Sequence, residues 1–229
     1  MQETGSNKEI ISIQVGLERY AFKIFSSTLV HSSGWMSADR IFTATELQHR
    51  YDEVRLSVFT PKCALVPADF FLRDHARELL AASAPVAPGD SVDYVPVQEF
   101  NSVLVFSNSN GGTLSRVIAD MVMNADGSKS PILPELYWIL KSLKDVSEYN
   151  KIIASYMDGY LYLAIAQGKS LMLCNSFEAP DFTTAQYHIF RAMKRLQLNP
   201  EISPIFFRTP LTEEQVMNLY NYFKSVEEI

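Results

Sequence analysis

The sequence has little cysteine and no long run of apolar residues. Two cysteines among 229 residues form neither a disulfide framework nor a zinc site, so we expect Cys63 and Cys174 to be buried as small apolar side chains. The longest apolar run, Tyr160 to Ala166, is far short of the roughly 18 residues that span a bilayer. The polar start, Met1 to Lys8, lacks the apolar core of a signal peptide. We therefore expect a cytoplasmic protein without membrane insertion.

Basic residues do not outnumber acidic ones. The sequence holds 20 lysines and arginines against 26 aspartates and glutamates, a formal net charge of -6. An acidic chain has no general attraction for phosphate backbones, so we expect a protein partner rather than a nucleic acid. The 4 histidines show no paired metal-ligand spacing, and no Gly-x-Ser-x-Gly motif is present. The sequence thus predicts no metal site and no catalytic residue, and it leaves the oligomeric state open.

Apolar residues are plentiful enough for a packed core, at 47% hydrophobic and 12% aromatic. In the first half, period-two alternation and short β-rich runs predict a hairpin over 9–25 and strands at 54–60, 63–66, 92–97 and 103–106. Helical spacing predicts helices over 37–50, 69–83 and 114–122 and another that starts at Pro134.

The second half has clearer signals. It predicts strands at 152–157, 160–166 and 170–177 and a last short strand at 204–208. Asp158-Gly159 predicts a two-residue hairpin turn, because both positions tolerate positive φ. Asp181 begins a helix with one apolar face, and Thr212 with Gln215 forms a capping box for a terminal helix. That terminal helix is expected to bury Val216, Leu219, Tyr220, Phe223 and Val226.

The order of elements in the second half is three strands, a helix, a strand and a helix (βββαβα), which favours a mixed sheet covered by helices. The first half also opens with a hairpin and continues into alternating helix and strand. Two halves of similar order suggest duplication, although the letters alone show no repeat. We expect an α/β protein of two related lobes.

This order, with several short motifs, resembles the actin-like ATPase superfamily, in which two ribonuclease-H-like lobes each carry βββαβα. The stretch from Ile153 to Ile165, with its continuation to Asp181, is similar to the start of the second lobe in pilus-assembly and cell-division members. Val92 to Val97, followed by Val103 to Phe106, looks like their late first lobe. The resemblance implies an actin-like ATPase fold with a first lobe at 1–148 and a second at 149–229.

More narrowly, the whole chain resembles an uncharacterised Bacteroidetes family, a domain of unknown function placed in that superfamily. That family implies no known activity. The residues that carry this resemblance are Ile11-Ser12-Ile13, Leu65-Val66-Pro67 before Phe70, and Asn175-Ser176-Phe177 with Asp181 and Tyr187.

Members of the superfamily hold phosphate and metal with an Asp-x-Gly turn in the first hairpin of each lobe, which places weak cofactor-binding candidates at Gln14, Gly16, Asp158 and Gly159. Gln14 carries no charge and is a poor ligand for Mg²⁺. In the second lobe, Met157-Asp158-Gly159-Tyr160 breaks the pattern in either alignment. The adenosine-binding glycine pair, expected after the fourth strand of that lobe, is replaced by Phe207-Arg208-Thr209-Pro210-Leu211. We therefore expect no cofactor.

Two features leave alternatives open. The loop Ser107–Thr113 precedes a helix and could bind an anion, or it is a small connection capped by Thr113; it lacks the Gly-Lys-Ser/Thr ending of a phosphate-binding loop. The helix that begins at Asp181 carries a basic stripe that could meet an acidic partner or be a solvated face. The stripe consists of His188, Arg191, Lys194 and Arg195. A nucleic-acid site would need Arg191, Lys194 and Arg195 together with Arg208.

These observations favour a non-catalytic scaffold or interaction protein on a degenerate actin-like ATPase fold, rather than an enzyme. The step from fold to function is an analogy. The alternative is a nucleotide-binding ATPase or switch that uses non-standard ligands in the cleft between the lobes.

Overall fold

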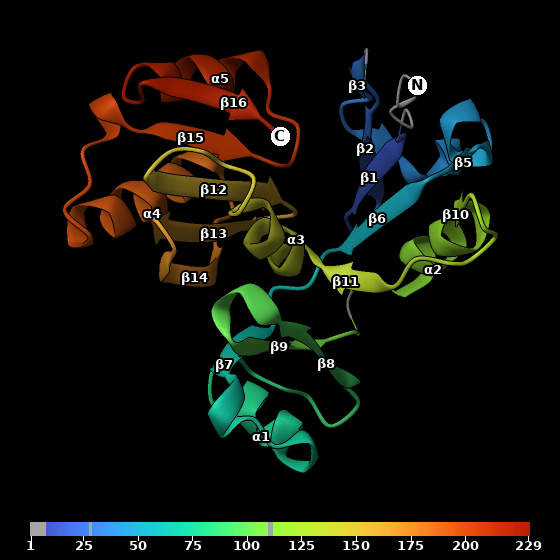
Figure 1. The fold of residues 1–229 in the computed structure, drawn as a ribbon, viewed down its shortest axis with the longest axis horizontal. Coiled ribbons are helices and arrows are strands. Elements are labelled where there is room, and N and C mark those ends of the chain that lie inside the picture. Colours follow the sequence, from blue (N-terminus) through green and yellow to red (C-terminus); the bar gives the residue numbers. More distant parts are fainter. Residues whose placement is uncertain (1–7, 28, 110–111) are drawn as a thin grey trace, which may run out of the picture. The chain divides into compact units, whose positions relative to one another are not determined.

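The computed structural model describes residues 8–27, 29–109 and 112–229, so the polar start Met1–Asn7 lies outside the described residues. The chain forms two compact units, each made of segments that are distant in sequence (Figure 1). Unit 1 comprises Met1–Val58 and Gly111–Leu133, and unit 2 comprises Phe59–Asn110 and Pro134–Ile229. These units divide the chain at other places than the boundary predicted between residues 148 and 149, and the two ribonuclease-H-like lobes remain a prediction.

Unit 1 is built around a sheet with the strand order β3-β2-β1-β6-β11, and β4 also pairs with β2. Its strands are β1 (Ile10–Val15), β2 (Arg19–Phe25), β3 (Val30–Ser32), β4 (Met36–Ser37), β6 (Glu53–Val58) and β11 (Ile132–Pro134). The hairpin of β1 and β2 is antiparallel as predicted, and β6 runs parallel to β1. Helix α2 (Gly112–Met121) packs on β6, and its Ile118 belongs to the same buried core as Ile11 and Ile13. The short strands β5 (Arg50–Tyr51) and β10 (Met123–Asn124) pair with one another.

The main sheet of unit 2 has the order β14-β13-β12-β15-β16. Its strands are β12 (Asn150–Met157), β13 (Tyr160–Gln167), β14 (Ser170–Glu178), β15 (Pro204–Phe207) and β16 (Ser225–Glu228). The first three form an antiparallel meander, while β15 lies parallel to β12 and β16 parallel to β15. Three strands in the predicted positions and the predicted fourth strand are therefore confirmed.

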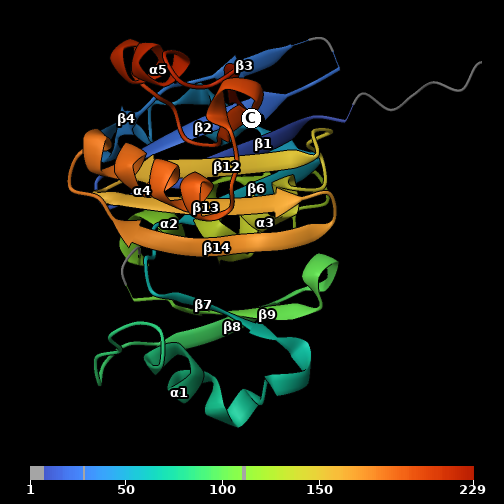
Figure 2. The ribbon, with the colours of Figure 1, turned by 90° about the vertical axis from the view of Figure 1, so that its left-hand side faces the viewer.

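Helices cover both faces of this sheet. The helices are α3 (Glu135–Ser142), α4 (Phe182–Arg195) and α5 (Glu213–Tyr220). Neighbouring strand residues point to opposite faces. Ala154 joins the core beneath α4, whereas Ser155 bonds to Glu135 of α3, so α3 and α4 lie on opposite faces. Figure 2 shows α4 running across the meander. No helix in the described part of the chain is long and apolar enough to cross a membrane.

A smaller sheet in unit 2 has the order β7-β9-β8. It is formed by β7 (Cys63–Pro67), β8 (Val92–Val97) and β9 (Ser102–Ser107), and α1 (Ala76–Ala81) packs on it through Leu80. Ser176 of β14 donates a hydrogen bond from Oγ to the Pro61 carbonyl at 2.6 Å. Lys141 of α3 pairs with Glu99 at 2.7 Å. These bonds tie the smaller sheet to the main sheet of the same unit.

The two five-stranded paths have the same order, β3-β2-β1-β6-β11 and β14-β13-β12-β15-β16. In each path, the first three strands pair in an antiparallel manner. The fourth strand pairs parallel with its neighbour: β6 with β1, and β15 with β12. The predicted duplication of element order is thus visible in the strand pairing, and the protein is a mixed α/β fold.

Three predicted helices differ from the structure. Residues 37–50 contain two short 3₁₀ turns, Ala38–Arg40 and Thr45–Gln48, in place of one helix. The buried Ile41, Ala44 and Leu47 recur every three residues, which does not keep to one face of an α-helix of period 3.6. The helix predicted over 69–83 is reduced to Ala76–Ala81 after two 3₁₀ turns. The terminal helix ends at Tyr220, and Val226 is buried from β16 instead, since its three-residue spacing from Phe223 does not distinguish a helix from a new strand.

Candidate functional site

The first hairpin of unit 1 contains both Gln14, near the end of β1, and Gly16, in the turn that follows. Gln14 lies in β1, almost fully buried, and its Nε2 donates to Ser12 Oγ at 3.0 Å. The Gly16 amide donates to the Arg19 carbonyl at 2.8 Å and closes the hairpin. The side-chain amide and the backbone amide that would have to serve a phosphate are therefore engaged within the hairpin itself.

Asp158 and Gly159 belong to unit 2, where they form the turn between β12 and β13. Both have positive φ, 49° and 75°, as the predicted two-residue turn requires. The Gly159 carbonyl accepts a hydrogen bond from the Ala179 amide at 2.7 Å. The turn is thus fastened to the segment that precedes α4, which agrees with a structural role for both residues.

Replacing Gly159 with alanine should lower the free energy of unfolding by about 1–2 kcal/mol, because an L side chain is strained at this φ. Space is not the cause, since the nearest atom to a Cβ there would be Pro180 Cα at 3.9 Å. Gly89→Ala is the matched control, because that glycine is surrounded by open space and needs no positive φ. Urea denaturation measures the free energy of unfolding of both variants. Equal losses in the two would contradict the expected backbone strain at Gly159.

The segment after β15 is occupied by two buried side chains, Arg208 and Thr209. Arg208 Nε donates to Glu135 Oε1 at 2.9 Å, with the two side chains 5% and 0% exposed. Arg208 Nη1 also donates to Ser142 Oγ at 3.1 Å, and the Thr209 hydroxyl accepts the Tyr156 amide at 2.9 Å. Where the resemblance implies glycines that admit adenosine, this chain has an ion pair that links α3 to the end of β15.

Two side chains near this ion pair, Ser155 and Tyr162, are fully buried. Burial raises the pKa of the Tyr162 hydroxyl well above its ordinary value, and the nearby Cys63, Glu135 and Asp158 raise it further. Glu135 was missed by the sequence reasoning, which took residues after Pro134 only as a helix start. A glutamate one position beyond that proline, on a helix that is otherwise apolar where it meets the sheet, was the available signal.

The loop Ser107–Thr113 is described only in part, because Asn110 and Gly111 lie outside the described residues. The Ser91 amide donates to Ser109 Oγ at 2.9 Å, and the Asn108 amide donates to the Ser91 carbonyl at 2.8 Å. The described part of the loop is thus bonded to the beginning of β8. Within the described residues, no three His, Cys, Asp or Glu side chains gather to hold a metal ion.

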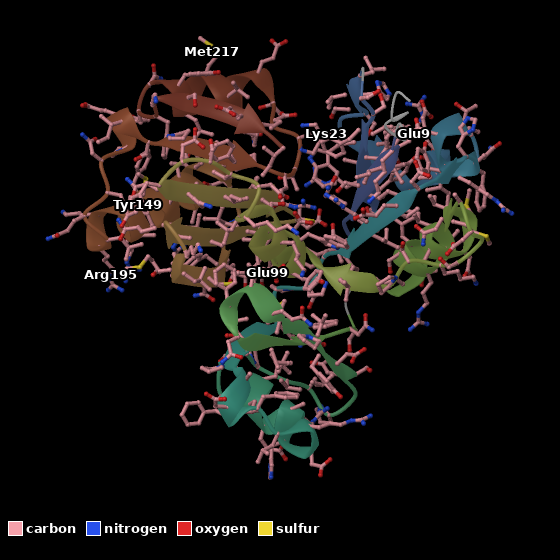
Figure 3. The ribbon with its side chains drawn as sticks, viewed as in Figure 1. Glu9, Lys23, Glu99, Tyr149, Arg195 and Met217 are labelled. Carbon is pink, nitrogen blue, oxygen red and sulfur yellow. The ribbon has the colours of Figure 1, made fainter. Side chains whose placement is uncertain are left out.

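A pocket of about 260 Å³ lies in unit 2 between the edge strand β14 and helix α4. We call it the β14–α4 groove. Its lining comprises Met172, Leu173, Asn175 and Phe177 from β14 and His188, Arg191, Ala192, Arg195 and Leu196 from α4 and its end. Figure 3 shows Arg195 pointing outward from this helix. The base of the groove is apolar, and two of its four polar side chains are arginines.

The two arginines of the groove, Arg191 and Arg195, lack acidic neighbours on their own helix. His188, Arg191 and Arg195 follow at three- and four-residue intervals and share one face of α4, which contains no Asp or Glu. Within the described residues, neither guanidinium has a hydrogen bond or an ion pair. The His188 ring stacks on Phe177 at 4.8 Å, and its Nδ1 is buried with no partner among the described residues.

Three of the four residues of the predicted basic stripe line this groove, and the fourth, Lys194, does not. The nucleic-acid patch considered from the sequence also needed Arg208. Arg208 cannot contribute to a surface patch, because it is buried in the ion pair with Glu135. The β14 side of the groove was not foreseen, since strand periodicity does not show which helix packs at a sheet edge.

The protein has an actin-like ATPase fold, with two sheets of matching strand order. In each sheet one parallel pair, β1 with β6 or β12 with β15, follows an antiparallel set of three strands. The chain belongs to the family described as "Protein of unknown function (DUF3822)", which matches residues 5–226. No protein of curated function matches the sequence.

Solved structures resemble the fold at low sequence identity. A Bacteroides thetaiotaomicron protein "with actin-like ATPase fold and unknown function" has a TM-score of 0.62 at 16% identity, over 100% of this chain and 94% of that one. The cytoplasmic domain of EpsL, an inner membrane component of the type II secretion system of Vibrio cholerae, has a TM-score of 0.46 at 13% identity, over 90% of this chain and 83% of that one. A chain of a PilM-PilN type IV pilus biogenesis complex has a TM-score of 0.48 at 11% identity, over 96% of this chain and 88% of that one. At these identities the first likeness shows the fold alone.

Proposed function

We propose that this protein is a non-catalytic scaffold or interaction protein, built from two ribonuclease-H-like lobes whose nucleotide-binding elements have been lost. The observation that carries the proposal is the buried Arg208–Glu135 ion pair after β15. A nucleotide in that position would need open backbone, and breaking a buried ion pair to make room leaves charges without compensation. The bonded Gln14 and Gly16 support the same conclusion in unit 1.

The proposal also includes a cytoplasmic location, an origin in the Bacteroidetes and a protein partner. These follow from the resemblance of the sequence and from its net charge of -6, which gives no general attraction for nucleic acid. The candidates Gln14, Gly16, Asp158 and Gly159 then serve as hairpin residues, and no cofactor is required for the role.

Isothermal titration of the full chain with ATP and Mg²⁺ tests the loss of nucleotide binding. We expect no saturable heat up to about 1 mM ATP, which corresponds to a binding free energy weaker than about -4 kcal/mol. ADP should behave in the same way, and incubation with ATP should release no phosphate. A micromolar dissociation constant for either nucleotide would overturn the proposal and favour a switch with non-standard ligands.

A further inference from the structure

We propose that the β14–α4 groove binds a short segment of a protein partner, in which an apolar side chain lies next to carboxylates. The inference rests on the proposed function and names the chemistry of the partner. It uses three observations: the size of the groove, its apolar base and its two arginines without acidic partners.

The size of the groove suits a single peptide side chain. Its volume of about 260 Å³ lies close to the lower end of the roughly 300–1,000 Å³ that pockets for small molecules span. Leu173, Phe177 and Leu196 give it an apolar base that suits one large apolar side chain. A helix packed beside an edge strand presents such a base without rearrangement of the core.

The charge of the groove selects the residues that flank this side chain. Arg191 and Arg195 are exposed, four residues apart on α4, and neither has an ion-pair partner among the described residues. A guanidinium binds a carboxylate through two parallel hydrogen bonds, so two arginines can hold two acidic side chains of one segment. In a chain with a net charge of -6, a helix that bears cations and no acid is a local exception.

Other occupants fit the groove less well. A two-fold contact between copies of this chain with its axis at the groove would bring the same arginines together, and like charges repel. A nucleic acid would be expected to stack bases on exposed aromatic faces, but Phe177 and His188 already stack on one another. An acidic, partly apolar peptide meets neither obstacle.

The experiment selects peptides from a random display library on the full-length protein and measures the enriched peptides by fluorescence anisotropy. We expect the enriched peptides to share a Phe, Leu or Ile next to Asp or Glu. Arg191→Glu/Arg195→Glu should weaken their binding at least about 30-fold, because two charge-assisted contacts become repulsive. Lys194→Glu is the matched control, since it reverses a charge on the same helix outside the groove, and it should change binding less than about threefold.

The peptide itself supplies a second readout that does not depend on folding of a variant. Amidation of its carboxylates and replacement of its apolar residue with alanine should each weaken binding about tenfold or more. Circular dichroism should show both protein variants folded, because the altered side chains are exposed. The melting temperature should fall slightly in both, because Lys194 and Arg195 lie in the last turn of α4, where cations are favourable to the helix dipole.

The assignment is overturned if no peptide is enriched, if the enriched peptides carry no acids, or if Lys194→Glu weakens binding as much as the double variant. It is also overturned if inorganic phosphate or a single-stranded oligonucleotide displaces the peptide at equal concentration, or if the enriched species is a segment of this chain that makes it dimerise. A silent ATP titration with failed peptide binding would leave the non-catalytic role standing and remove only this site. A positive ATP titration would remove the proposed function instead.

Discussion

Replacing Arg208 with methionine is expected to lower the free energy of unfolding of unit 2 by about 3–5 kcal/mol. Arg208 Nε and Glu135 Oε1 are 2.9 Å apart, in side chains that are 5% and 0% exposed. Methionine retains much of the length of arginine but leaves the Glu135 carboxylate without its cation. Ser155 Oγ still donates to Glu135 at 2.6 Å, yet one neutral donor does not offset the desolvation of a buried charge.

Urea denaturation followed by tryptophan fluorescence can isolate this effect in unit 2. The chain has two tryptophans, Trp35 in unit 1 and Trp138 in α3, so a Trp35→Phe background leaves Trp138 as the only reporter. The matched control adds Glu135→Gln to Arg208→Met. It removes the stranded charge and should recover at least half of the loss. A loss below about 1 kcal/mol in the single variant would contradict the expected cost of leaving Glu135 without its arginine.

The elements that the sequence predicts well are those with local causes. The Asp158-Gly159 turn forms because adjacent residues accept positive φ, and Thr212 with Gln215 makes its capping box within four residues. Asp181 likewise accepts the Thr184 amide at 2.7 Å and caps α4. Residues that decide such features are near neighbours, so a single sequence contains the whole interaction.

The ion pair at the end of β15 shows the opposite situation. Arg208 and Glu135 are separated by 73 residues, and their meeting depends on α3 and β15 being placed against the same strand, β12. In the sequence, Arg208 is one cation of a possible basic patch and Glu135 is a helix-start residue. Pairing across a sheet removes both from the surface, and no local pattern encodes that pairing.

The β14–α4 groove lies between these two cases. Helical spacing predicted the cationic face of α4, because residues three and four apart share a face. It did not predict that Leu173 and Phe177 would complete the base, since that requires β14 to be the edge strand under α4. The strand order of the sheet, rather than any motif, therefore creates the candidate site.

The thiol of Cys174 is expected to react with Ellman's reagent about 1,000-fold more slowly at pH 8 in the folded protein than in the urea-unfolded chain. The reactive species is the thiolate, and burial raises the pKa of Cys174 from 9.0 to about 12. Burial also raises the pKa of Cys63, and the nearby Cys174 adds to it. A Cys63→Ala variant leaves Cys174 as the only thiol, because the chain has two cysteines.

The pH dependence gives this prediction its sign. A thiol is neutral when protonated, so a raised pKa in the folded state stabilises the fold below the ordinary pKa near 9, and that contribution is lost as the pH rises toward 12. The native reaction rate should therefore rise about tenfold per pH unit up to pH 11, whereas the unfolded rate should level off above pH 9. Low urea concentrations that leave the fold intact should not accelerate the reaction of Cys174 with Ellman's reagent.

A native rate that levels off above pH 9 would mean that the Cys174 sulfur reaches solvent. The sequence predicted two buried cysteines, but the structure shows both residues only partly buried. Cys174 lies in β14 two residues before Ser176, which donates to the carbonyl of Pro61 near Cys63, and burial raises the pKa of both thiols. Thiol reactivity thus tests, at one atom, how closely the smaller sheet of unit 2 packs against its main sheet.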